Sequence, residues 1–138
     1  MATKILGIAL VIFALGIAIV PHFTDCYSQG QLVTLANGAK QPMKCHWTAQ
    51  AEITVGAPLA VVGALLPFSR RKGMARSLAV MGIALGAVAI ALPYSLIGTC
   101  AMPTHICNTA MKPALTALGS LGIVGSLGVM LTAGRLKD

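Results

Sequence analysis

The sequence predicts an all-α membrane protein, folded as a bundle of four transmembrane helices. Of its 138 residues, 57% are hydrophobic and only 9% are charged, whereas soluble domains carry about 25% charged residues. Four apolar stretches, each of roughly twenty residues, are long enough to cross a hydrocarbon core about 30 Å thick. A surface so poor in charge is expected to face lipid.

The expected spans, within a single domain of residues 1–138, cover about residues 4–23, 48–68, 77–97 and 109–133. The basic start and short apolar core of the first span resemble a signal peptide. No clear small-x-small cleavage site precedes Pro21, so we expect a retained helix. Pro58 and Pro93 lie inside the second and third spans, where neighbouring helices can satisfy the carbonyls that proline leaves free.

Polar connecting segments separate these spans. The two longer ones cover residues 24–47 and 98–108, and a short basic turn lies between the second and third spans. In the first of them, Leu32 to Leu35 precede Asn37-Gly38, a pattern that indicates a small β-hairpin.

The distribution of basic residues favours an orientation with both termini in the cytoplasm. On that side would lie seven residues, Lys4, Arg70, Arg71, Lys72, Arg76, Arg135 and Lys137, against three on the other, Lys40, Lys44 and Lys112. Cytoplasmic segments of membrane proteins carry an excess of Lys and Arg. We therefore expect a multi-pass protein of the bacterial cytoplasmic membrane, with segments 24–47 and 98–108 outside the cytoplasm.

Small residues are spaced to let the helices approach one another closely. In lipid no hydrophobic force drives helices together, so close backbone contact matters more. The candidate packing positions are Gly82, Gly86, Gly119, Gly122 and Gly125. They would pack the four helices together, or offer a face to the helices of another protein.

One acidic residue, Glu52, lies near the hydrocarbon, about one turn into the second span. An ionised carboxylate in lipid is costly. Lys112 lies at a similar depth in the fourth span, so a Glu52–Lys112 pair is one expectation. The other is an acid near a helix N-terminus, where the helix dipole favours it.

All four cysteines, Cys26, Cys45, Cys100 and Cys107, fall in or beside the two longer connecting segments. Outside the cytoplasm, four cysteines indicate two disulfides that brace these segments. Three pairings are open; proximity in sequence favours Cys26–Cys45 with Cys100–Cys107, and the alternatives would join the two segments. A thiol-disulfide oxidoreductase is a further alternative, although the chain has no Cys-x-x-Cys pair of the reactive kind.

A metal site is another alternative. Thiol, thioether and imidazole ligands occur together in Cys45, His46, Met102, His105 and Cys107, a mixture that suits Cu(I) or Zn(II). The spacing matches no defined zinc motif. Haem ligation by a histidine and a methionine is also conceivable, although the chain has no attachment motif. The leading expectation is that no cofactor is bound.

Other function classes find little support. The net charge of +7 reflects basic residues at the ends of the apolar segments, and aromatic residues make up only 4% of the chain, so we do not expect nucleic-acid binding. We see no catalytic triad, phosphate-binding loop or pair of catalytic carboxylates. We therefore expect a non-enzymatic accessory subunit that packs against a larger membrane protein, or a homo-oligomer in the lipid bilayer.

Two short motifs resemble those of an uncharacterised bacterial family of small four-span membrane proteins. The first is the run Met43-Lys-Cys-His-Trp-Thr-Ala-Gln-Ala-Glu52, in which Met43, Lys44, His46, Trp47 and Gln50 form the outer-face motif. The second comprises Gly98-Thr-Cys100, Met102-Pro103, Cys107 and Pro113-Ala-Leu115. The resemblance implies that both motifs form one outer-face structure, and that the partner is a permease of an ABC-type transporter. It implies no activity.

Overall fold

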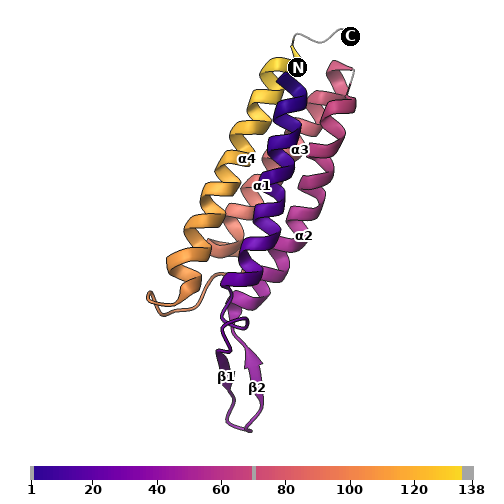
Figure 1. The fold of residues 1–138 in the computed structure, drawn as a ribbon. Coiled ribbons are helices and arrows are strands. Elements are labelled where there is room, and N and C mark those ends of the chain that lie inside the picture. Colours follow the sequence, from indigo (N-terminus) through magenta and orange to yellow (C-terminus); the bar gives the residue numbers. More distant parts are fainter. Residues whose placement is uncertain (1, 70, 135–138) are drawn as a thin grey trace.

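The computed structural model describes residues 2–69 and 71–134 and consists mainly of four long helices that run up and down in a bundle (Figure 1). The helices are α1 (Ala2–Thr24), α2 (Lys44–Leu65), α3 (Lys72–Ala91) and α4 (Lys112–Ala133). A 3₁₀ turn, η1 (Leu66–Phe68), extends the end of α2. Two π turns, η2 (Leu92–Leu96) and η3 (Cys107–Met111), extend the end of α3 and the start of α4.

With these extensions, four helical stretches are long and apolar enough to cross a membrane, as in a multi-pass membrane protein. All four start earlier than predicted, the first only slightly, at Ala2 rather than 4. α2 begins at Lys44 rather than 48, α3 at Lys72 rather than 77, and the fourth stretch at Cys107 rather than 109. Hydropathy marks the part of a helix that suits hydrocarbon, and these first turns are polar or basic, so the apolar pattern did not include them.

The predicted hairpin is confirmed. Strands β1 (Leu32–Thr34) and β2 (Lys40–Pro42) pair antiparallel, with Val33 opposite Gln41. Gly38 has a φ of +81° in the connecting turn, a conformation that glycine adopts without strain. The hairpin projects from the end of the bundle opposite the start of α1 and the end of α4 (Figure 1).

Close backbone contacts join the helices in pairs. α1 packs against α2 and α4, and α3 packs against α4 and α2. A Cβ added at Gly86 would lie 3.0 Å from the carbonyl oxygen of Gly119, and the reverse distance is also 3.0 Å. On the other side, a Cβ at Gly63 of α2 would lie 2.9 Å from the carbonyl oxygen of Gly7 in α1. Both helical hairpins therefore depend on glycine where their backbones meet.

The other predicted packing glycines differ in how tightly they are enclosed. A Cβ at Gly82 would clash with the hydroxyl of Ser126. At Gly122 and Gly125 the nearest atoms belong to leucine side chains, 3.9 and 3.4 Å away, which is ordinary contact. Gly82, Gly86 and Gly119 thus lie at close α3–α4 contacts, whereas the other two positions leave room for a methyl group.

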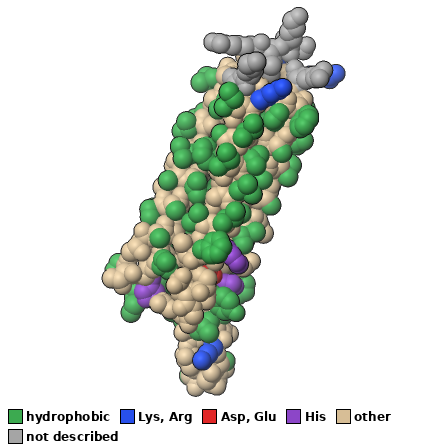
Figure 2. All heavy atoms as spheres, in the orientation of Figure 1, with side chains coloured by type: hydrophobic (Ala, Val, Ile, Leu, Met, Phe, Trp, Pro, Cys, Tyr) green, Lys and Arg blue, Asp and Glu red, His purple; other side chains and the backbone are tan. Residues whose placement is uncertain are grey.

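The outer surface of the bundle is apolar along most of its length (Figure 2). Large hydrophobic side chains such as Ile5, Ile12, Val124 and Leu131 are exposed. Such a surface is suited to a lipid environment, since exposed hydroxyls such as those of Thr54 and Ser120 bond to carbonyl oxygens of their own helices.

Candidate functional site: four cysteines at one end of the bundle

The four cysteine sulfurs meet at the hairpin end of the bundle, and we call this group the thiol cluster (Cys26, Cys45, Cys100 and Cys107). All four Sγ atoms lie within 4.8 Å of one another. The Sγ atom of Cys26 is 2.8 Å from that of Cys107 and 3.4 Å from that of Cys100, which in turn is 3.2 Å from that of Cys45. Three of the cysteines are buried, and Cys100 is half-buried.

Each cysteine reaches the thiol cluster from a different part of the fold. Cys26 follows the end of α1, and Cys100 lies in the loop between η2 and η3. Cys45 is in the first turn of α2, and Cys107 is the first residue of η3. Helix N-termini carry partial positive charge, which favours a thiolate over a thiol. The sulfur of Cys45, in the first turn of the long helix α2, therefore lies where the helix dipole favours negative charge.

The side chain of Asn108 fixes the loop that carries Cys100. Its amide nitrogen donates hydrogen bonds to the carbonyl oxygens of Cys100 (2.8 Å) and Met102 (2.9 Å). Its amide oxygen accepts a hydrogen bond of 2.6 Å from the hydroxyl of Thr99. The side chain of Asn108 thus bonds to three residues of this loop.

A second contact ties this loop to α2. The buried hydroxyl of Thr48 donates a 2.7 Å hydrogen bond to the carbonyl oxygen of Gly98. Gly98 has a φ of +85°, so the chain turns sharply there in a conformation that favours glycine. Cys100 is thereby held against the first turn of α2, where Cys45 lies.

The thiol cluster is not disulfide-bonded. All four cysteines are free, and the shortest Sγ–Sγ separation, 2.8 Å, is longer than the roughly 2.05 Å of a disulfide. The two pairings favoured by proximity in sequence are not the closest ones. The closest contacts, Cys26 with Cys107 and Cys45 with Cys100, join the first connecting segment to the second.

The mixed ligand set predicted for a metal is only partly brought together. Cys45 and Cys107 belong to the thiol cluster, and Nδ1 of His105 is 3.9 Å from the Sγ of Cys26. His46 lies outside the thiol cluster, with its Nδ1 hydrogen-bonded to the carboxylate of Asp25, and Met102 is 61% exposed at the surface of its loop. The structure therefore does not group these two residues with the four sulfurs, because adjacency in sequence does not determine where a side chain points.

His46 forms a hydrogen-bonded pair with Asp25 next to the thiol cluster. Its Nδ1 donates to Oδ2 of Asp25 at 3.0 Å, and its ring contacts Tyr27 and Trp47. Burial alone would raise the pKa of Asp25, but hydrogen bonds from Ser28 and His46 outweigh it and lower the pKa below its ordinary value. Because Asp25 directly precedes Cys26, this pair fixes the chain where it leaves α1.

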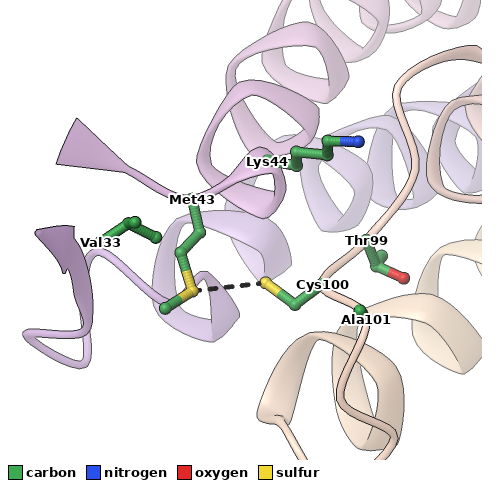
Figure 3. A pocket seen from close by; sticks show the side chains of 6 residues that line it. All are labelled: Val33, Met43, Lys44, Thr99, Cys100 and Ala101. Atoms are coloured by element: carbon green, nitrogen blue, oxygen red, sulfur yellow. Dashed lines mark hydrogen bonds between the residues drawn. The ribbon is translucent and has the colours of Figure 1, made fainter. Parts of the chain in front are cut away.

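The remaining outer-face motif residues line two cavities. Met43 and Lys44 line a cavity of about 300 Å³ together with Cys100, and the Sδ of Met43 is 3.6 Å from the Sγ of Cys100 (Figure 3). Gln50 and His46 line a second cavity, of about 360 Å³. Trp47 is 59% exposed, as expected for a residue at a membrane interface.

The predicted Glu52–Lys112 pair is not formed. Glu52 is fully buried, and neither of its carboxylate oxygens has a hydrogen-bond partner among the described residues. The Nζ atom of Lys112 lies over the ring of Tyr94, 4.2 Å from its centroid. Similar depth in the bilayer did not bring the two together, because α2 packs mainly on α1 and α3 while Lys112 reaches Tyr94 in η2.

Sequence reasoning missed several residues that shape the site. Asp25, Asn108 and Thr48 position the cysteines, and Met43 had been noted only as part of a motif. For the first two there was a weak signal, since each is a polar residue directly beside a cysteine. No pattern indicated that Thr48 would bond to a loop fifty residues away.

Comparison with known proteins identifies the family and nothing beyond it. A family model described as "Domain of unknown function (DUF4418)" matches residues 4–132, nearly the whole chain. No curated protein and no solved structure matches the chain. The expected resemblance to an uncharacterised family is confirmed at this level, and the chain belongs to the DUF4418 family.

Proposed function

We propose that this protein is a non-enzymatic integral membrane protein that binds a soft metal ion, Zn(II) or Cu(I), in its thiol cluster. The observation that carries the proposal is the convergence of four sulfurs from four chain segments, all within 4.8 Å of one another. Thiolate is a preferred ligand of both ions.

The spacing of the sulfurs is compatible with one shared ion. Zinc–sulfur bonds of about 2.3 Å in tetrahedral geometry separate the sulfurs by roughly 3.8 Å. The separations of 2.8, 3.2 and 3.4 Å and the upper limit of 4.8 Å lie on both sides of that value. Shifts of about 1 Å or less in the nearest pairs would give a regular site.

Two structural disulfides would not require all four sulfurs to lie close together. Two disulfides need two close pairs, with no need for the pairs to approach each other. In the thiol cluster, the Sγ atom of Cys26 is close to two other sulfurs, and so is that of Cys100. Sulfurs that share neighbours in this way favour a common ligand over separate bonds.

Metal binding to this cluster would be coupled to proton release. Burial, followed by hydrogen bonding with the thiol of Cys107, raises the pKa of Cys26 above its ordinary value. Cys26 is therefore a neutral thiol near pH 7 when no ion is bound. A metal ion must displace that proton, so we expect its affinity to increase as the pH rises.

We further infer that the thiol cluster faces the outside of a bacterial cytoplasmic membrane. This orientation rests on the sequence count of seven basic residues in the segments expected on the cytoplasmic side against three in those expected outside. In that compartment the cysteines encounter oxidants, and a bound ion would protect them from forming disulfides.

The proposal is tested by measuring the metal content of the purified protein. The protein should be purified in mild detergent without added chelator, and Zn and Cu measured by elemental analysis together with free-thiol titration. We expect about one bound ion per chain, and loss of the ion in Cys26→Ser and Cys107→Ser variants. His22→Ala is the matched control, because His22 lines the other cavity and should not alter metal content.

Two results would contradict metal binding. Chains without metal in which non-reducing peptide mapping finds two disulfides would identify the thiol cluster as a structural clamp. A cysteine pair that cycles readily between thiol and disulfide in the presence of a mild reductant would instead favour the oxidoreductase alternative.

We also propose that the protein is an accessory subunit that packs against a larger membrane protein. Its support is the small size of the chain and its exposed apolar surface, which can pack against lipid or against another membrane protein. Copurification from mild detergent should yield a stoichiometric partner, and an ABC-type permease is the partner we expect. Recovery of only a monomer or a homo-oligomer would count against it.

A further inference from the structure

We propose that the ion bound by the thiol cluster is Cu(I), and that it enters through the cavity between Met43 and Cys100. This inference rests on the metal-binding function proposed above and specifies which ion is bound and by which route. The observation that carries it is that the thioether of Met43 and the half-buried thiol of Cys100 line the same cavity, with their sulfurs in contact.

The sulfurs form a continuous path from the cavity to the buried part of the thiol cluster. The cavity measures about 300 Å³ and is lined by Val33, Met43, Lys44, Thr99, Cys100 and Ala101. Figure 3 shows the Sδ atom of Met43 directed toward the Sγ atom of Cys100, at a distance of 3.6 Å. From there the sulfurs of Cys45 and Cys26 are 3.2 and 3.4 Å away, and Cys107 lies 2.8 Å beyond Cys26.

The chemistry of this path distinguishes Cu(I) from Zn(II). Thioether sulfur is a soft ligand that binds Cu(I), whereas zinc sites use thiolate, imidazole and carboxylate. Among the lining residues, the side chains that could act as ligands are Met43 and Cys100, with no imidazole or carboxylate beside them. A zinc ion would therefore find little to hold it before it reached the thiolates.

Charge adds to this selectivity. Lys44 lines the same cavity and is exposed. The Coulomb repulsion between its ammonium group and an approaching ion is proportional to the charge of the ion. A divalent ion is repelled twice as strongly as a monovalent one, so the entrance favours Cu(I) on electrostatic grounds as well.

Transfer along the path is a ligand exchange without electron transfer. The bond between copper and the Sδ of Met43 breaks as a bond to the Sγ of Cys100 forms, and the thiol proton passes to water. The same exchange then moves the ion to the sulfurs of Cys45 and Cys26. Copper stays in the +1 state throughout, so no oxidant or reductant is required.

The test compares metal uptake by the full-length protein in detergent, reduced and without oxygen. Cu(I) is supplied from a colorimetric chelator complex and Zn(II) from a zinc-indicator complex, and both uptake rates are followed by absorbance. Met43→Leu keeps the volume of the side chain and removes the sulfur. Met102→Leu is the matched control, because Met102 is 61% exposed outside the thiol cluster.

We expect Met43→Leu to slow Cu(I) uptake about tenfold, the lower end of the roughly 10–100-fold that loss of a residue supporting a metal site costs, with the final Cu(I) content and the Zn(II) rate unchanged. Met102→Leu should change neither rate. An unchanged Cu(I) rate in Met43→Leu, or equal slowing of both metals, would overturn the route. A wild-type protein that binds neither ion would instead disprove the metal-binding function itself.

A second variant tests the entrance without altering a buried side chain. In Lys44→Gln, loss of the positive charge should speed the uptake of both ions. The factor for Zn(II) should be about the square of the factor for Cu(I), because the repulsion energy doubles with charge. If Lys44→Gln changed the two uptake rates by the same factor, the charge of Lys44 would not select between the ions, and this part of the route would be wrong. A wild-type protein that takes up Zn(II) faster than Cu(I) and retains it in excess of Cu(I) would overturn the assignment of the ion.

Discussion

The loop that carries Cys100 should open when the side chain of Asn108 is truncated. Asn108→Ala removes two donated hydrogen bonds, to the carbonyl oxygens of Cys100 and Met102, and one accepted from Thr99. A hydrogen bond contributes about 0.5–1.5 kcal/mol, and these bonds are only partly buried, so we take about 0.7 kcal/mol for each. The sum is about 2 kcal/mol, which multiplies the population of the open loop by about thirty.

The assay is the rate at which Cys100 reacts with a bulky thiol reagent, with modified residues assigned by mass spectrometry. Cys100 is the half-buried member of the thiol cluster, so opening of its loop should raise its labelling rate by about thirtyfold while the other three thiols react slowly. Asn37→Ala is the matched control, because the side chain of Asn37 bonds only within the exposed turn of the hairpin. A change of less than about threefold in Asn108→Ala would refute the view that this side chain holds the loop.

Three further predictions concern stability. Gly86→Ala places a methyl group 3.0 Å from a backbone oxygen of α4, so we expect thermal unfolding in detergent to show that the free energy of unfolding falls by about 1–3 kcal/mol. The control is Gly73→Ala, which has open space around it and should be neutral or slightly stabilising. The pKa of Asp25 is lowered in the folded protein by hydrogen bonds from Ser28 and His46, so these bonds stabilise the fold above the unfolded pKa. Circular dichroism should show this contribution disappearing below about pH 4 and missing in Asp25→Asn. Glu52 is buried with no hydrogen-bond partner among the described residues, so Glu52→Met should raise the melting temperature, and a lower one would indicate that the carboxyl group has a partner.

The architecture was predictable because its main determinants are local. The apolar length of each span and the Asn37-Gly38 turn depend on a few neighbouring residues, and they predicted four helices and one hairpin. Helix starts were less predictable. α3 begins at Lys72 because a basic first turn is compatible with a helix, although it is incompatible with hydrocarbon.

The site was only partly predictable because its contacts are long-range. The sequence indicated that cysteines would gather at one end, yet Cys26 meets Cys107 across 81 residues and Cys45 meets Cys100 across 55. Proximity in sequence favoured other pairs. In the same way Met102, next to Cys100 in sequence, points outward, while Met43 reaches that cysteine from the start of α2.

If the thiol cluster binds a metal ion as proposed, its position gives the four sulfurs a structural role at this end of the bundle. Glycine contacts join α1 to α2 and α3 to α4 within the membrane, but they do not fix the long segments beyond α1 and η2. Cys26 and Cys45 belong to the first helical hairpin, and the other two cysteines belong to the second. An ion held by all four would therefore join the two hairpins where glycine packing cannot. Its binding energy would add directly to the stability of the folded bundle, by about 2.7 kcal/mol at an ion concentration one hundred times the dissociation constant.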